Sequence, residues 1–453
     1  HKPMIQQALP RDLSLIDLQR LAPGRYALLL ESVADSKALS RWDFLLIANG
    51  EGLICDAGGQ TKNLCGEIVA GKFLEALDDV WKNSANDEDN SDIPFRGGWA
   101  LFLSYELAGQ IESRLKLPLS DGPLPMALAL RCPAAILRNK NTGEVFAIAE
   151  PGNESLLAQL QKDISDANNL APLASLSKPH TIHEEAPEKF LEGVEKIHAY
   201  LRQGDIFQVN LSRAWRAEFD QSPDPASLYQ SLCQHNPAPF AGSLMHGNWS
   251  LLSSSPERLV SCHKGDVQTR PIAGTRPRFA GDDDSHRIRE LVGHPKERAE
   301  HVMLIDLERN DLGRVCEPGS VHVDELMAVE SYAHVHHIVS NVRGRLRADV
   351  TPGQVIAAVF PGGTITGCPK VRCMEIIAEL ESEARGPYTG AFGYLNHNGD
   401  MDLNILIRSA WLSEKQCELR AGAGIVVDSV AEHELQETRA KAKGLLRALG
   451  ADV

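Results

Sequence analysis

The sequence predicts an α+β or α/β protein in which one or two large sheets are covered by helices. Short apolar runs of strand length, amphipathic segments of helix length and the mixture of both along the chain lead to this fold class. The 453 residues, 43% hydrophobic and 24% charged, are ordinary for a soluble globular chain that buries a large core.

The first half of the chain consists mainly of short expected strands. They span residues 26–30, 44–47, 99–103 and 145–149. An acidic, asparagine-rich piece at 83–92 predicts a solvated loop, and a stretch rich in Ser, Pro and His at 171–187 predicts a connector. We therefore expect a β-rich half over 1–175 and a second half over 176–453, packed together as one two-lobed unit.

The second half alternates helices with strands. The expected helices span residues 188–202 (ending at Gly204), 295–307, 351–359, 369–380 and 431–449. The expected strands span residues 206–211, 250–254, 390–395 and 402–411, and the segment around Ala273 is expected to be a strand or a turn.

Charge and cysteine usage exclude several classes of protein. The net charge of −15 argues against binding to a nucleic-acid backbone, which needs clustered Lys and Arg. We find no apolar run of about 18 residues and no leader pattern, so neither a membrane span nor export is expected. The nine cysteines are scattered without a close C-x-x-C pair, which predicts reduced thiols in a cytoplasmic protein.

Two expected helices carry the same acidic pattern. Glu297 and Glu300 are three residues apart, as are Glu434 and Glu437, so each pair lies on one helical face. Lys441 follows one turn after Glu437. One interpretation is two solvated acidic faces. The other is that the pairs face each other across a cleft and bind a hard cation such as magnesium.

Other segments offer groups for binding and proton transfer. Glu257 and His337 are candidate proton-transfer groups, although either type of residue is more often an ordinary surface or core residue. Arg408 could clamp a carboxylate. The glycine-rich segments 361–370 and 420–424 could offer backbone amides to an anion, or could simply be tight turns.

The segment Arg270-Pro-Ile-Ala-Gly-Thr-Arg-Pro-Arg278 and the motifs above resemble the chorismate-utilising enzymes. This family includes the anthranilate synthase large subunit, aminodeoxychorismate synthase component I, isochorismate synthase and salicylate synthase. The resemblance covers about 187–449, and the first half matches more loosely through 28–32 and 40–43. It implies an anthranilate-synthase-like fold with large, mostly antiparallel sheets covered by helices.

The resemblance also implies roles for individual residues. It implies a magnesium ion held by Glu300 and Glu437, with Glu297 and Glu434 acting directly or through water. Glu257 resembles the general acid that protonates the departing hydroxyl of ring carbon 4. The residues that match the substrate-binding positions are Thr275, His337, Thr364, Tyr388, Arg408, Gly422, Ala423, Gly424 and Lys441.

Two positions bear on the choice of nucleophile. Ala273 stands where some relatives have a lysine that attacks the ring, so a covalent link through this residue is excluded. Gln208 stands where water-using relatives have a lysine base, and an amide cannot deprotonate water. Gln208 therefore favours amination by ammonia over isochorismate or salicylate synthesis.

The two aminating branches of the family remain alternatives. Ala273 and the following Pro277-Arg278 resemble anthranilate synthase. The segments that resemble aminodeoxychorismate synthase are 208–211, 236–240, 255–258, 361–366 and 401–405. We expect the second branch, with ammonia adding first at ring carbon 2 and a second ammonia then attacking carbon 4. A non-catalytic relative that binds chorismate or tryptophan is a further alternative, although it should have lost part of the polar cluster.

The resemblance finally bears on partners and regulation. No Gly-x-Cys-x-Gly motif of a glutaminase surrounds any cysteine. Either free ammonia suffices, or a separate glutamine amidotransferase subunit delivers it, as the family implies. In anthranilate synthases, the positions matched by Ser32, Asn236 and Pro237 help form a tryptophan pocket. These three residues are therefore candidates for a tryptophan site.

Overall fold

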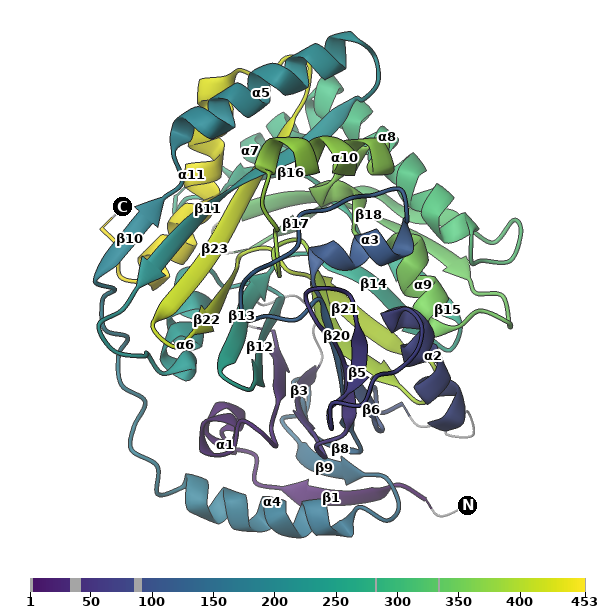
Figure 1. Cartoon of the computed structure of the whole chain (residues 1–453), viewed down its shortest axis with the longest axis vertical. Helices are drawn as coiled ribbons and strands as arrows, with labels where there is room; N and C mark the ends of the chain where they lie inside the picture. Colours follow the sequence, from purple (N-terminus) through teal and green to yellow (C-terminus); the bar gives the residue numbers. More distant parts are fainter. Residues whose placement is uncertain (1–2, 33–41, 85–91, 282, 333–334, 453) are drawn as a thin grey trace.

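Two large antiparallel sheets form the body of the protein. The computed structural model describes residues 3–32, 42–84, 92–281, 283–332 and 335–452. Within these residues one sheet has 12 strands and the other 11, and neighbouring strands run antiparallel. This arrangement confirms the expected α+β fold with large antiparallel sheets. Figure 1 shows the two sheets with helices around them.

The strands of the larger sheet come from both halves of the chain. In spatial order they are β1 (Ile5–Leu9), β9 (Val145–Ala149), β8 (Ala134–Asn139), β3 (Trp42–Ile47), β2 (Leu28–Glu31), β12 (Phe240–His246), β13 (Trp249–Ser255), β22 (Ser409–Ser413), β23 (Gln416–Ile425), β11 (Gln208–Glu218) and β10 (Thr181–Glu184), with β19 (Gly367–Cys368) also paired to β11.

The strands of the second sheet also come from both halves of the chain. Its order is β16 (Ile272–Pro277), β18 (Val335–Arg345), β15 (Asp266–Thr269), β14 (Arg258–His263), β21 (Met401–Ile405), β20 (Ala391–Asn396), β6 (Gly98–Leu103), β7 (Ala127–Cys132), β4 (Gly52–Cys55) and β5 (Thr61–Asn63), with β17 (His322–Ser331) paired to β18. The expected boundary near residue 175 falls between α4 and β10, where the chain has neither helix nor strand, while both sheets continue across the two halves.

Helices cover the outer faces of the sheets. They are α1 (Leu15–Leu21), α2 (Phe73–Ser84), α3 (Ala108–Ile111), α4 (Glu154–Ala167), α5 (Pro187–Arg202), α6 (Pro225–His235), α7 (Asp284–Gly293), α8 (Pro295–Gly313), α9 (Pro352–Val359), α10 (Lys370–Glu381) and α11 (Ala431–Ala448), with short 3-10 turns at Tyr105–Leu107 and Gly363–Ile365. None of the helices among the described residues is long and apolar enough to cross a bilayer.

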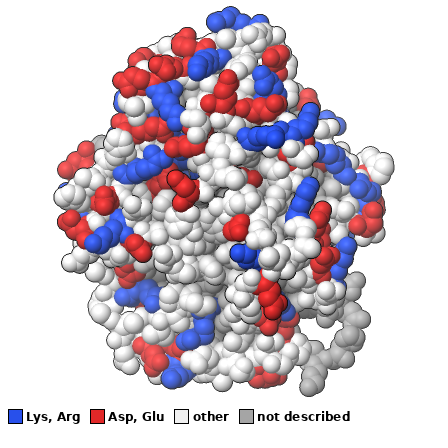
Figure 2. Space-filling model, in the orientation of Figure 1, with Lys and Arg blue, Asp and Glu red and all other residues white. Residues whose placement is uncertain are grey.

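The core is divided between the sheets and their helical layers. Phe44 and Leu128, from different sheets, belong to one buried cluster that fills the space between the sheets. A second cluster packs α6 and α11 on the outer face of the larger sheet, and a third packs α2 and α9 on the other. In the view of Figure 2, acidic and basic side chains are interspersed, so the net charge is not gathered in one patch on this face.

Several elements differ from the expectation. The expected strand at 402–411 is wrong, because β21 ends at Ile405, β22 begins at Ser409, and the two belong to different sheets. Arg408, between them, has a φ of 53°, in the left-handed region where a residue cannot continue a strand. The expected acidic loop at 83–92 and the 40–43 match lie largely outside the described residues.

Candidate active site

Two adjoining cavities lie where strands of both sheets meet α8 and α11. The first, called the inner cavity, has a volume of about 150 Å³. The second, called the carboxylate cavity, has a volume of about 470 Å³. The residues that line both cavities, and so join them, are Asn210, Ile272, Thr275, Thr364 and Lys441.

The structure brings the predicted catalytic, substrate and metal residues to these two cavities. Besides the shared Thr275, Thr364 and Lys441, those on the inner cavity are Glu257, His337, Tyr388, Arg408 and Gly422. Those on the carboxylate cavity are Gln208, Ala273, Glu297, Glu300, Ala423, Gly424, Glu434 and Glu437. Some of these residues are more than 200 positions apart in the sequence, so only folding brings them together.

Glu257 is a buried carboxyl group held at the start of β14. Its Oε1 accepts a hydrogen bond of 2.9 Å from the hydroxyl of Thr364 and one of 3.3 Å from the amide of Ile272. Burial raises the pKa of Glu257 to about 8, and the charge of the buried Glu308 acts in the same direction. The side chain is therefore protonated at neutral pH and can donate a proton into the inner cavity.

His337, in β18, also lines the inner cavity. Its Nδ1 is 3.0 Å from the hydroxyl of Thr275, and its ring lies 5.9 Å from that of Tyr332. Burial lowers the pKa of His337 to about 4, helped by the positive charge of Arg408. At neutral pH the ring is uncharged and serves as a hydrogen-bonding wall rather than as a cation.

Glycines in β23 make room for the polar side chains of Gln208, Asn210 and Tyr388. A Cβ on Gly422 would lie 2.6 Å from the Tyr388 hydroxyl and 2.9 Å from Nδ2 of Asn210, and a Cβ on Gly424 would lie 2.6 Å from Nε2 of Gln208. The 420–424 segment is thus neither a loop nor a turn but a strand paired with β11. The pairing of β22 with β23 ends at Leu419. The next residues of β23, from Arg420 to Gly422, therefore border the inner cavity.

Asn210 was not among the predicted site residues. It lines both cavities, and its Nδ2 is buried without a hydrogen-bond partner in the structure. Strand periodicity could have indicated it, since residues two apart in a strand point to the same face and Asn210 follows Gln208 by two.

Two cations face the cavity. The Arg408 guanidinium donates to the carbonyl of Lys441, and the Lys441 ammonium donates to the carbonyl of Gly422 over 3.0 Å. Burial lowers the pKa of both side chains. Among the ion pairs between described residues, none involves either of them. Their charges therefore remain available to carboxylates of a bound ligand.

The four glutamates line one cavity but do not form a preformed metal cluster. Arg276 binds Glu297 Oε1 at 2.5 Å, while Glu297 Oε2 is buried and has no hydrogen-bond partner. Burial, reinforced by the neighbouring Glu437, raises the pKa of Glu434. No group of three His, Cys, Asp or Glu in the described part of the chain is spaced to hold a metal. The cavity thus gathers negative charge that an added cation would relieve.

The structure does not bring the three candidate tryptophan-site residues into one cavity. Ser32 lines a separate cavity of about 240 Å³ between the sheets, together with Trp42, Phe240 and Tyr394. Asn236 and Pro237 do not line it. Asn236 is instead the C-terminal cap residue of α6. Its side-chain amide donates a hydrogen bond of 3.0 Å to the carbonyl of Ser254 and so connects α6 with β13.

Comparisons with known proteins agree with the geometry. A model of the chorismate binding enzyme family matches residues 35–447. The chain is 41% identical to aminodeoxychorismate synthase component 1 of Bacillus subtilis, covering 82% of this chain and 80% of the relative. It is 35% identical to anthranilate synthase component 1 of Aquifex aeolicus, covering 94% and 90%.

A solved structure supports the same assignment. The anthranilate synthase component I of Streptococcus pneumoniae superposes with a TM-score of 0.81 at 32% identity, covering 91% of this chain and 93% of the other. This similarity confirms the expected anthranilate-synthase-like fold. The family match, the relatives and the clustered site residues lead to one conclusion: the chain belongs to the chorismate-binding enzyme family.

Proposed function

We propose that this enzyme aminates chorismate to 4-amino-4-deoxychorismate, a precursor of p-aminobenzoate and folate. One observation carries the proposal: the buried, protonated Glu257 shares a cavity with the unpaired cations Arg408 and Lys441, next to a wall where Ala273 offers no nucleophile. Relatives named for aminodeoxychorismate synthase and for anthranilate synthase support amination and leave the product to be decided.

The residues present suit a noncovalent route with two ammonia molecules. In the first step, ammonia bonds to ring carbon 2 of chorismate, the ring double bond shifts, and the carbon-4 hydroxyl leaves as water with the proton of Glu257. In the second step, another ammonia bonds to carbon 4 and the first amine leaves from carbon 2. The net reaction exchanges one hydroxyl for one amino group. Ala273 requires that the intermediate be held by binding alone.

The cations and polar groups orient the ligand during these steps. Arg408 and Lys441 suit the carboxylates of chorismate, and Asn210 offers a buried amide with an unused donor. Uncharged His337, supported by Thr275, suits contact with the ring hydroxyl or ring face rather than with a carboxylate. Gln208 lacks a basic nitrogen, so ammonia acts as its own nucleophile.

Magnesium fits the carboxylate cavity and forms part of the proposal. The unpartnered buried Oε2 of Glu297 and the repulsion between Glu434 and Glu437 are the features that a hard cation would relieve. Glu297, Glu300, Glu434 and Glu437 are the residues that would hold it. When bound, it would supply positive charge next to a substrate carboxylate.

The proposal also includes the source of ammonia and the cellular location of the enzyme. Ammonia is supplied by a separate glutamine amidotransferase subunit, since no glutaminase motif surrounds any cysteine of this chain. The location is the cytoplasm, which suits nine unpaired thiols, most of them buried.

The anthranilate synthase alternative shares the first step and then eliminates pyruvate. Mass analysis of the products from chorismate, ammonium chloride and magnesium chloride separates the two. We expect aminodeoxychorismate, one ammonia consumed per chorismate and no pyruvate. Anthranilate and pyruvate as the sole products would overturn the proposal, and binding without turnover would support a non-catalytic relative.

A further inference from the structure

Arg276 pairs with one of the four glutamates proposed to hold magnesium. It lies on β16 and lines the carboxylate cavity together with Glu297, which is in the first turn of α8. Nη2 of its guanidinium lies 2.5 Å from Oε1 of Glu297, and Nη1 donates to the carbonyl of Thr275 over 3.1 Å. A cation that binds Glu297 must therefore compete with this ion pair.

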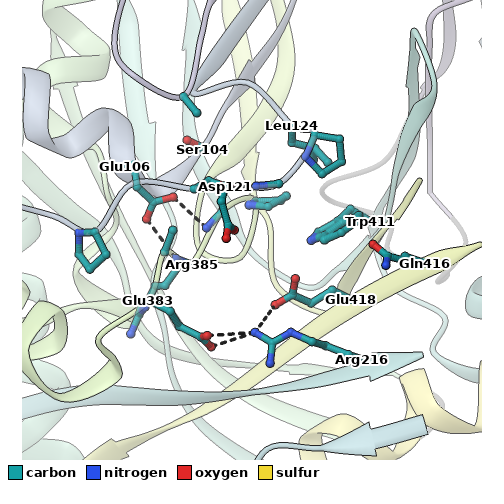
Figure 3. Close-up of a pocket in the computed structure, with 18 of the residues that line it drawn as sticks. Ser104, Glu106, Asp121, Leu124, Arg216, Glu383, Arg385, Trp411, Gln416 and Glu418 are labelled. Atoms are coloured by element: carbon teal, nitrogen blue, oxygen red, sulfur yellow. Dashed lines mark hydrogen bonds and ion pairs between the residues drawn. The ribbon is translucent and has the colours of Figure 1, made fainter. Parts of the chain in front are cut away.

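The ion pair satisfies only one oxygen of Glu297. Its Oε2 is buried and has no hydrogen-bond partner in the structure. Glu106, in a different cavity, shows the contrast: both of its oxygens accept hydrogen bonds, from the backbone amides of Gly386 at 2.8 Å and Arg385 at 3.1 Å (Figure 3). A buried carboxylate oxygen without a partner raises the free energy of the folded protein. The Arg276 pair leaves this cost in place, whereas a metal ion that contacts Oε2 would remove it.

The pair of Arg276 with Glu297 is open enough to separate. The two side chains are 22% and 23% exposed, whereas those of Arg385 and Glu381, behind the active site, are each 1% exposed. Separating a fully buried pair leaves each charge with neither water nor partner. Arg276 and Glu297 instead border a cavity of about 470 Å³, in which water or a ligand can take the place of either partner.

A divalent ion has more to gain from this cavity than the guanidinium has. Glu300, Glu434 and Glu437 line it together with Glu297, and their carboxylates repel one another unless a cation lies between them. Magnesium carries two charges and prefers carboxylate oxygens as protein ligands. Because two cations repel each other at one carboxylate, Arg276 must leave Glu297 when such an ion binds there.

We propose that Arg276 is an internal counter-ion of Glu297, that magnesium displaces it, and that its released guanidinium then binds a carboxylate of chorismate. This inference rests on the proposed function, which supplies the metal ion and the substrate. A guanidinium suits a carboxylate because its donors form a planar fork. Arg276 thereby couples the two ligands: chorismate binds more tightly once the arginine is free, and by linkage magnesium binds more tightly in the presence of chorismate.

Calorimetric titration of magnesium in the absence of substrate is the first test. In Arg276→Met, the affinity for magnesium should rise about tenfold or more, because the ion no longer replaces a bound cation. Arg298→Met is the matched control, because it removes the same charge from the residue next to Glu297, at an exposed position that lines neither cavity. It should change the affinity for magnesium by less than about twofold.

A double-mutant cycle separates direct competition from the general effect of charge. In a Glu297→Gln protein, the further change Arg276→Met should raise the magnesium affinity by less than about twofold, since the ion pair is already lost. The melting temperature at saturating magnesium shows whether each variant is folded. If Arg276→Met is not, Arg276→Gln takes its place in the same titrations.

The second test titrates chorismate without ammonium, so that no amination takes place. Without magnesium, Arg276→Met should bind chorismate as the unmodified enzyme does. With saturating magnesium, its affinity for chorismate should be about fivefold or more below that of the unmodified enzyme, because the released guanidinium is missing. Arg298→Met should match the unmodified enzyme in both titrations.

The outcomes separate this inference from the proposed function. An unchanged magnesium affinity in Arg276→Met, or an equal rise in Arg298→Met, refutes the competition, as does a lack of magnesium binding by the unmodified enzyme. An unchanged chorismate affinity at saturating magnesium refutes the role of the released guanidinium. Neither titration measures amination. An enzyme that gives the expected result in both, and yields no amino product from chorismate and ammonium, overturns the proposed function alone.

Discussion

The hydroxyl of Thr364 donates a hydrogen bond of 2.9 Å to Oε1 of Glu257, which lies 107 residues earlier in the chain. Oε1 also accepts a hydrogen bond from the amide of Ile272. Both hydrogen bonds of this oxygen are therefore made within the protein. The other oxygen remains for the proton that the buried carboxyl group retains at neutral pH. A turn after α9 thereby sets the direction in which a carboxyl group just before β14 can donate its proton.

Replacing Glu257 tests its role as the proton donor. In Glu257→Gln, kcat should fall by about 10² to 10⁴, the usual contribution of a positioned acid. Chorismate affinity should change little, since the amide keeps the size of the side chain. Steady-state kinetics and calorimetric titration measure the two effects. An unchanged kcat would remove Glu257 from the mechanism.

The raised pKa of Glu257 predicts a specific pH dependence. The acid must be protonated, so kcat should fall as the pH rises through about 8. Since the folded-state pKa lies above the unfolded value, the stabilising effect of the bound proton is present at low pH and is lost as the pH rises through about 8. Glu257→Gln should therefore melt at a higher temperature than the unmodified enzyme at pH 9. A lower melting temperature there would contradict the assigned pKa.

Restoring a lysine at position 273 should change the chemistry. Ala273 and Thr275 line the carboxylate cavity on β16, and an amine there can attack the ring of a bound substrate. Ala273→Lys incubated with chorismate should give a protein adduct by mass spectrometry. The unmodified enzyme should give none under the same conditions, and an adduct on it would refute the noncovalent route.

The close contacts of Gly422 predict a strong effect of one methyl group. In Gly422→Ala, the new Cβ would lie 2.6 Å from the Tyr388 hydroxyl, so Tyr388 or Asn210 must move. Chorismate affinity should fall about tenfold or more, corresponding to about 1.4 kcal/mol. Gly293→Ala, at the end of α7 with no atom near its Cβ, is the control and should bind normally. If both variants bind chorismate equally well, Tyr388 and Asn210 can move without weakening substrate binding.

The magnesium proposal is tested on α11. In Glu437→Gln, the magnesium concentration that gives half-maximal turnover should rise about tenfold or more, because a carboxylate ligand becomes a neutral amide. Glu432→Gln removes the same charge from an exposed position on this helix and should leave that concentration unchanged. If chelation with EDTA does not reduce turnover of the unmodified enzyme, magnesium is not required.

A buried ion pair behind the active site predicts a loss of stability. Glu381 accepts hydrogen bonds of 2.9 Å from the amide and the hydroxyl of Ser212, and Arg385 binds it with two donors. Burial opposes ionisation of Glu381, but Arg385 outweighs it and lowers the pKa. Glu381→Gln should cost about 3–5 kcal/mol of unfolding free energy, because it leaves Arg385 buried without its counter-charge.

The matched control for this loss lies on the same helix. Glu375→Gln breaks only an exposed pair with Arg372, 4.0 Å apart, and should change the unfolding free energy by less than about 1 kcal/mol. Denaturant unfolding at pH 7 measures both variants. A similar small change in each would show that the Glu381 pair contributes little.

The sequence predicted correctly those helices and strands that neighbouring residues specify. The expected strand at 145–149 matches β9, and the expected helix at 351–359 matches α9, which begins after the capping box of Thr351 and Gln354. The helices α4 (Glu154–Ala167) and α6 (Pro225–His235) were not predicted.

The sequence by itself determined what the site cannot do, whereas the tertiary structure decided which groups meet there. The side chains of Ala273 and Gln208 lack a basic nitrogen whatever their surroundings. The break at Arg408, the sharing of each sheet by both halves and the exposure of Asn210 to the cavity depend on strand pairing between distant segments. Such pairing depends on packing energies between residues far apart in the sequence, and no local pattern records them.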